Sequence, residues 1–235
     1  MPKLLKGNFA VKILVVFLLI VGIGVIVVLP KLETYLEIKS IEQTNLKTIE
    51  SSVLLEVPFI CQAPLQTEEN WKHHEESCEE AAILQTYLYV NNKTMTKEKA
   101  NEEILKMEDW QIEHFGSHRD IYADEVKNLI KGYYNLKEND IEIIYDATLE
   151  DIRNRISSGY PVIVPIMGNI LKNPYYPYPG YHMLVAIGYT KERIITNDNG
   201  TKRGANFSYD NQTFYDAMTA AGGDVVIIKT KTTNP

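Results

Sequence analysis

Hydrophobic positions divide the chain into a continuous apolar run near the N-terminus and a longer region of mixed pattern. The seventeen residues 13–29 carry no charged or strongly polar side chain. This length is at the short end of what a membrane-spanning helix needs. Lys3, Lys6 and Lys12 precede the run without an acidic residue between them. The positive-inside rule therefore predicts a cytoplasmic N-terminus and a folded region outside the membrane.

This pattern predicts four parts: a cytoplasmic N-terminus (1–12), a transmembrane anchor (13–30), a polar linker (31–52) and one folded domain (53–235). The length of the last part, about 185 residues, suits a single domain. A cleaved signal peptide is the alternative interpretation of the apolar run. No small-x-small cleavage site follows the run, which favours the uncleaved anchor.

Within the domain, helical periodicity comes first and strand-like runs follow. Spacings of three and four predict helices, and short runs rich in valine and isoleucine predict strands. The expected helices are 77–90, 97–106, 121–131 and 149–157, and the expected strands are 161–166, 182–189, 193–198 and 224–229. Ser77 and Glu80 are expected to form a capping box. This order predicts an α+β domain with a mostly antiparallel sheet.

Composition narrows the function classes. Hydrophobic residues make up 45% and charged residues 23%, as in globular proteins. Acidic residues outnumber basic ones by 31 to 24, which argues against a nucleic-acid partner. The two cysteines, Cys61 and Cys78, are too few for a disulfide scaffold or a cysteine-rich zinc site. We expect neither a metal site nor a cofactor.

Cys78 is a candidate nucleophile because it falls at the start of a predicted helix. Unpaired N–H groups and the helix dipole favour a thiolate there. Four glutamates at positions 75, 76, 79 and 80 oppose ionisation. A buried, inert cysteine is the alternative.

His182 and Asp198 are predicted to face each other across a hairpin. His182 opens one strand and Asp198 ends the next, about two residues apart in register. A carboxylate in this place would orient the imidazole to accept a proton from a thiol. The backbone N–H of Cys78 and the amide of Gln62 are candidate donors to an oxyanion. A simple Asn-Asp-Asn-Gly turn is the alternative for the segment around Asp198.

Four segments resemble C39-like peptidase domains of bacterial proteins: VPFICQAP, ESCEEAA, GYHMLVAIGY and ITNDNGTKRG. Their order and spacing agree with that family across residues 53–229. The resemblance implies a papain-like α+β fold with Cys78 as nucleophile, His182 as base, Asp198 as the residue that orients His182, and Gln62 in the oxyanion hole. Asn199 stands where many members carry proline, which is expected to loosen the turn and to leave the chemistry unaffected.

The function predicted first is a membrane-anchored peptidase that hydrolyses peptide bonds outside the cell through an acyl-enzyme. Trp71, Tyr178 and Tyr181 are predicted to contact a peptide or protein substrate, because the tyrosine- and proline-rich segment 173–181 suits a stiff aromatic rim. Packing alone is an equal alternative for that segment. Two other functions stay open: a non-catalytic surface module with a Cys61–Cys78 disulfide, and an amidase of peptidoglycan peptides.

Overall fold

The computed structural model describes residues 52–176 and 180–229. The expected cytoplasmic N-terminus, the transmembrane anchor and all but the last residue of the linker lie outside these residues. In the described part, no helix combines the length and the apolar character that crossing a membrane requires. The folded part belongs to one compact unit.

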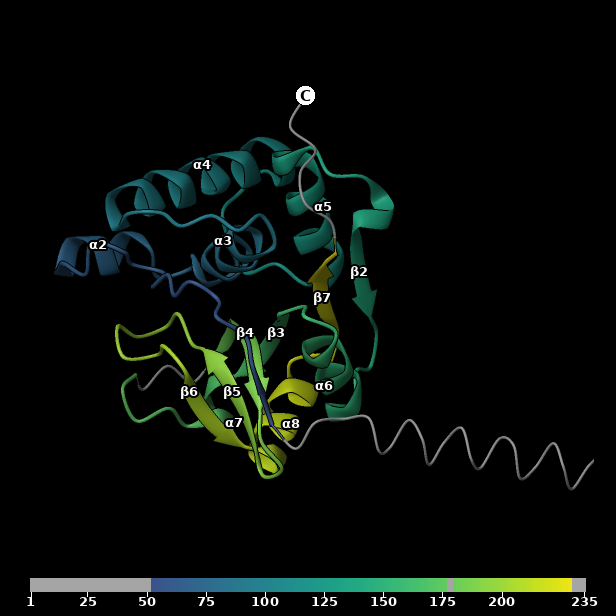
Figure 1. The fold of residues 1–235 in the computed structure, drawn as a ribbon. Coiled ribbons are helices and arrows are strands. Elements are labelled where there is room, and N and C mark those ends of the chain that lie inside the picture. Colours follow the sequence, from purple (N-terminus) through teal and green to yellow (C-terminus); the bar gives the residue numbers. More distant parts are fainter. Residues whose placement is uncertain (1–51, 177–179, 230–235) are drawn as a thin grey trace, which may run out of the picture. The chain divides into compact units, whose positions relative to one another are not determined.

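One antiparallel sheet forms the centre of this unit (Figure 1). Among the described residues it has seven strands in the order β2-β7-β3-β4-β5-β6, with β1 paired to β4. The strands are β1 (Val53–Leu54), β2 (Ile141–Ile144), β3 (Val162–Met167), β4 (Tyr181–Tyr189), β5 (Arg193–Asn197), β6 (Phe207–Asp210) and β7 (Val225–Ile228). The predicted α+β class with an antiparallel sheet is therefore confirmed.

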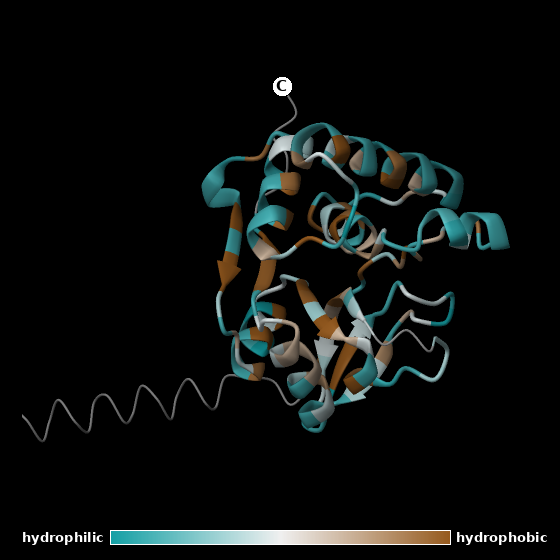
Figure 2. Ribbon diagram, turned by 180° about the vertical axis from the view of Figure 1, so that it is seen from behind, coloured by the Kyte–Doolittle hydropathy of each residue, from teal (hydrophilic) through white to brown (hydrophobic). Residues whose placement is uncertain are grey.

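Helices pack around the sheet, and most of the first half of the unit is helical (Figure 1). They are α2 (Glu68–His73), α3 (Cys78–Val90), α4 (Lys97–Phe115), α5 (Ala123–Tyr134), the 3-10 turn η1 (Glu138–Asp140), α6 (Leu149–Ser157), α7 (Gly168–Leu171) and α8 (Asn211–Ala220). Helix α3 packs against β4 and against α4, and α8 packs against β3. Most of α4 is hydrophilic (Figure 2), and its apolar residues Ala100, Ile104 and Met107 are buried.

Helix α3 is the central helix of the unit. Ala81, Leu84 and Leu88, the residues whose spacing predicted it, are almost fully buried. The expectation of a single buried face was too narrow, because Glu79 and Gln85 are also fully buried. The start of α3 is consequently enclosed by protein.

The capping box predicted at Ser77 and Glu80 is wrong. Ser77 makes no side-chain capping bond to α3. Its hydroxyl instead donates to Oε1 of Glu108 on α4, at 2.6 Å. Glu80 points to Gln111, also on α4. A carboxylate is a stronger acceptor for the serine hydroxyl, and α4 supplies one.

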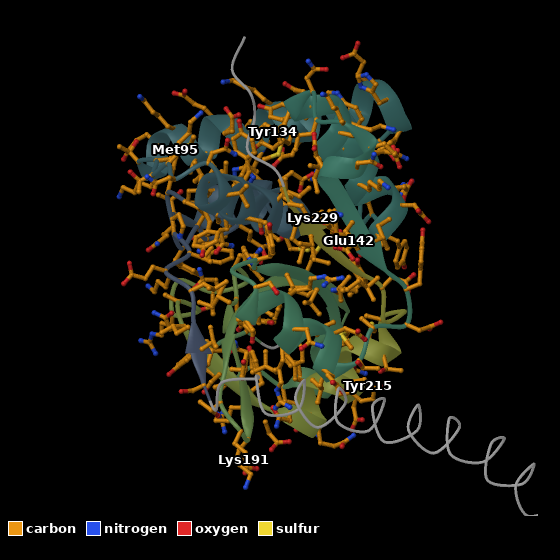
Figure 3. All side chains as sticks on the ribbon, turned by 45° about the vertical axis from the view of Figure 1, so that its right-hand side comes forward. Met95, Tyr134, Glu142, Lys191, Tyr215 and Lys229 are labelled. Carbon is orange, nitrogen blue, oxygen red and sulfur yellow. The ribbon has the colours of Figure 1, made fainter. Side chains whose placement is uncertain are left out.

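The edge of the sheet formed by β2 carries charged pairs. Glu142 on β2 lies 3.8 Å from Lys229, which follows β7 (Figure 3). It also lies 2.5 Å from Arg155 on α6. Such charges on a sheet edge discourage pairing with another chain. Strands β2 and β6 and helices α2 and α8 were not predicted from the sequence, because their hydrophobic runs are short.

Candidate active site

Cys78 is the first residue of α3, and only 3% of its surface is exposed. Its thiol donates to Oε2 of Glu79 at 3.0 Å, and Sγ accepts the backbone N–H of Met183 at 3.3 Å. Among the hydrogen bonds of the described residues, none joins Sγ to His182. The thiol is thus held by its neighbour in the helix and by the strand β4.

The surroundings of Cys78 favour the neutral thiol. Burial, followed by the charge of Glu79, raises the pKa of Cys78 well above its ordinary value. Burial and the charge of Glu80 likewise raise the pKa of Glu79. Cys78 therefore keeps its proton at neutral pH in this arrangement. The helix start alone predicted a thiolate, but burial against a carboxyl group outweighs the dipole.

His182 and Asp198 meet as the hairpin register predicted. His182 is the second residue of β4, and Asp198 follows β5, whose residue Asn197 pairs with Val185. Nε2 of His182 lies 3.1 Å from Oδ1 of Asp198. With Nε2 occupied by the carboxylate, Nδ1 is the ring nitrogen left to exchange a proton with another group.

Asp198 is fully buried and has several hydrogen-bond donors. Its Oδ2 accepts from the side chains of Asn173 (3.0 Å), Tyr176 (3.0 Å) and Tyr209 (2.5 Å). Burial opposes ionisation of Asp198, but the bonds from His182, Tyr209 and Asn173 together lower its pKa below the ordinary value. The carboxylate is therefore charged and fixed in position.

Asn173 and Tyr209 are the site residues that sequence reasoning missed. Asn173 begins the tyrosine- and proline-rich segment that suggested a substrate rim, and its amide is turned inward to Asp198 and Tyr209. Tyr176 of the same segment also donates to Asp198. The asparagine at the start of this segment was the available signal, since a buried carboxylate needs donors.

Gln62 lies beside the start of α3. Its side-chain Nε2 donates to the backbone carbonyls of His74 (2.8 Å) and Glu75 (3.1 Å). Its backbone N–H donates to the carbonyl of Asn199 at 3.0 Å. In this arrangement the amide ties down the loop between α2 and α3. An oxyanion would accept one of the two side-chain N–H groups of Gln62 that donate to these carbonyls.

Asn199, the residue expected to loosen the turn, lies beside the start of α3. Its side chain is fully buried and donates to the carbonyl of Cys78 at 2.8 Å. Cys61 lies on the other side of this loop, where its thiol contacts the carbonyl of Asn199 at 3.5 Å. Both cysteines are free thiols in the structure. Burial raises the pKa of Cys61 to about 11.

A pocket of about 690 Å³ opens onto the three groups that the sequence singled out as nucleophile, base and oxyanion donor. Cys78, His182 and Gln62 line it, and Trp71 and Tyr181 form part of its wall. Tyr178, the third residue predicted to contact substrate, lies outside the described residues. The pocket is large enough for side chains of a peptide.

Two clusters of the described residues could offer ligands to a metal ion. The first comprises His73, His74 and Glu108, and the second Cys78, Glu79 and Asp120. Both ring nitrogens of His74 have protein partners, among them Oε1 of Glu108 at 2.7 Å. The first cluster is therefore a hydrogen-bond network in its own right.

Comparison with known proteins identifies the family and the fold. None of the curated proteins matches the chain. A crystal structure described as a C39-like peptidase from Bacillus anthracis superposes with a TM-score of 0.52 at 16% identity, covering 76% of this chain and 97% of that one. At this identity the match shows the fold alone. The model of the C39-like peptidase family matches residues 54–225. The chain therefore belongs to the C39-like peptidase family.

Proposed function

We propose that the chain is a cysteine peptidase that hydrolyses peptide bonds through an acyl-enzyme. The observation that carries this proposal is the contact of buried Asp198 with Nε2 of His182, whose ring lines the same pocket as Cys78. This contact leaves Nδ1 of His182 to act on a thiol. Membership of a peptidase family supports the same reaction class.

In the proposed reaction, the Cys78 side chain turns from Glu79 toward His182. Nδ1 of His182 takes the thiol proton, and the thiolate attacks the carbonyl carbon of the scissile bond. The resulting imidazolium, stabilised by Asp198, returns the proton to the leaving amine. Water then attacks the thioester, with His182 as base, and releases the acid product.

The developing oxyanion needs donors, and two are at hand. The N–H of Cys78 belongs to the first turn of α3, where N–H groups have no acceptor within the helix. The amide of Gln62 is the second donor, once it gives up a carbonyl of the loop between α2 and α3. Donors of this kind are worth about 10²-fold to 10³-fold in rate.

The test is hydrolysis of a peptide mixture by the purified full chain under reducing conditions, with products identified by mass spectrometry. Cys78→Ala is expected to abolish cleavage, and His182→Ala to lower kcat by about 10²-fold to 10⁴-fold. Cys61→Ala, which removes the other buried thiol, is the matched control and should keep its activity. Full cleavage by Cys78→Ala would overturn the proposal. Isolated peptidoglycan as a parallel substrate distinguishes an amidase from a protein-directed peptidase.

The second candidate is a binding module without catalysis. It is favoured by the raised pKa of Cys78 and by the bond of its thiol to Glu79. A module of this kind would bind peptides without cleaving them. It would also show no faster alkylation of Cys78 in the wild type than in His182→Ala.

We also propose that the domain is held outside the cytoplasmic membrane by the apolar residues 13–29. The lysines before this run and its length support the orientation. Carbonate extraction of membranes should leave the full chain in the pellet, and protease added to spheroplasts should digest the domain. Release into the supernatant as a shortened chain would indicate a cleaved signal peptide instead.

A further inference from the structure

The pocket in front of Cys78 is strongly acidic. Four carboxylates line it, from Glu68, Glu75, Glu76 and Asp120, against one ammonium group, from Lys72. Among the residues that the structure describes, no Lys or Arg lies within ion-pair distance of any of the four acids. The wall thus carries more acidic than basic groups, although Lys72 lines the same pocket and His182 and His118 act on Asp120.

Glu76 and Asp120 are the two acids set deepest in this wall, since both are half-buried. Burial, and after it the charge of Glu76 and a hydrogen bond with it, raise the pKa of Asp120 to about 6. The two carboxyl groups are thus close enough to oppose each other's ionisation. A cation placed between them would relieve this repulsion.

Aromatic rings complete the pocket. Trp71, Tyr176 and Tyr181 line it together with the acids. A ring face attracts an ammonium or guanidinium group, and it also covers the aliphatic stem that carries the charge. Acids and rings together suit a long cationic side chain better than a short or purely apolar one.

The acidic wall reaches the reacting group itself. A carboxylate oxygen of Asp120 lies within 4.8 Å of Sγ of Cys78. A side chain in this pocket must therefore belong to a substrate residue close to the bond that Cys78 would attack.

We infer that this pocket selects peptides with a lysine or arginine side chain next to the scissile bond. The inference rests on the proposed function for the position of that bond. The selectivity itself rests on the carboxylates of Glu76 and Asp120, helped by the more exposed Glu68 and Glu75 and by the three aromatic rings.

Binding is tested first, on the inactive Cys78→Ala full chain. Three peptides that differ at one position, lysine, norleucine or glutamate, are titrated by calorimetry and by the change in tryptophan fluorescence, since Trp71 lines the pocket. We expect the lysine peptide to bind at least about tenfold more tightly than the norleucine peptide, and the glutamate peptide most weakly. Asp120→Asn and Glu76→Gln should each reduce the lysine preference about threefold to tenfold, as expected for half-buried charge pairs.

Matched variants keep the result interpretable. Glu150→Gln removes an exposed carboxylate on α6, away from the pocket, and should leave the preference unchanged. Glu75→Gln removes an exposed carboxylate of the pocket, so it tests the same idea if the half-buried variants fail to fold. Equal binding of the lysine and norleucine peptides, tighter binding of the glutamate peptide, or no binding at millimolar concentration would overturn the inference.

Hydrolysis of the same peptides separates this inference from the proposed function. Lysine-selective binding without cleavage by the wild type would refute the peptidase and leave the cationic pocket in place. Cleavage that Cys78→Ala abolishes, without a lysine preference in kcat/KM, would support the peptidase and refute the selective pocket.

Discussion

After burial, Glu79 is the largest contributor to the raised pKa of the proposed nucleophile, Cys78. Its Oε1 accepts the N–H of Ile121 at 2.9 Å, which fixes the carboxyl group, while Oε2 meets the thiol of Cys78. Of two adjacent acids in one buried site, the first to ionise opposes the ionisation of the second. Glu79 therefore holds the thiol in its resting, protonated form.

Replacing Glu79 by glutamine is expected to lower the pKa of Cys78, because an amide cannot ionise. The alkylation rate at neutral pH should rise about tenfold for each unit by which the pKa falls. The measurement is the rate of iodoacetamide labelling from pH 6 to 10, in a Cys61→Ala background so that one thiol reports. An unchanged pH profile would show that burial alone raises the pKa.

Gly200 sits against the imidazole of the proposed base. A Cβ at this position would lie 3.1 Å from both Cε1 and Nε2 of His182 and 3.1 Å from Cε1 of Tyr176. Gly200→Ala should therefore displace the ring from Asp198. We expect kcat to fall about tenfold to a hundredfold, the loss typical of a misplaced catalytic group, while the melting temperature changes by only a few degrees. Wild-type activity in this variant would argue against His182 as the base.

At the scale of elements, helix α4 holds the loop between α2 and α3 through Glu108. Oε1 of Glu108 accepts from Ser77 at 2.6 Å and lies 2.7 Å from Nδ1 of His74. The carbonyl of His74 in turn accepts from the amide of Gln62. A side chain of α4 thereby positions the proposed oxyanion donor.

Glu108→Ala is expected to lower the free energy of unfolding by about 2–4 kcal/mol, because it removes the buried carboxylate that Ser77 and His74 share and leaves them only their mutual contact and the contact of His74 with Asn101. Urea unfolding measures this loss. Glu113→Ala, at an exposed position of the same helix, is the control and should change stability little. Equal losses in the two variants would show that the buried network contributes nothing.

At the scale of the whole molecule, buried acids set the acid limit of stability. Burial opposes ionisation of Asp198 and Glu108, yet hydrogen bonds lower the pKa of both. The unfolded chain therefore binds protons more readily at these two sites. Their contribution is present above the unfolded carboxyl pKa of about 4 and is lost as pH falls through the lower folded values. The raised pKa of Asp120 acts with the opposite sign, so its contribution is lost as pH rises through about 6.

We expect the melting temperature to fall steeply below about pH 4. Thermal unfolding from pH 2 to 8 measures the effect. Asp198→Asn should make the fall in melting temperature at acid pH less steep, whereas Asp216→Asn, at an exposed position of α8, should not. If the melting temperature falls equally at acid pH in the wild type and in Asp198→Asn, the effect belongs to other carboxyl groups.

The sequence by itself determined the helices and strands with long hydrophobic periods and the antiparallel class of the sheet. It also placed His182 within about two residues of Asp198 across the hairpin, because the register of a short hairpin follows from local spacing. The family could also be identified from the sequence, because the order and spacing of the motifs along the chain do not depend on the structure.

Only the tertiary structure decided the partners of these residues. Asn173 reaches Asp198 across 25 positions, and Glu108 takes the hydroxyl of Ser77 across 31. It also decided that Cys78 rests as a neutral thiol. Burial and the approach of distant donors control ionisation, and neither is encoded in the residues that flank a position along the chain.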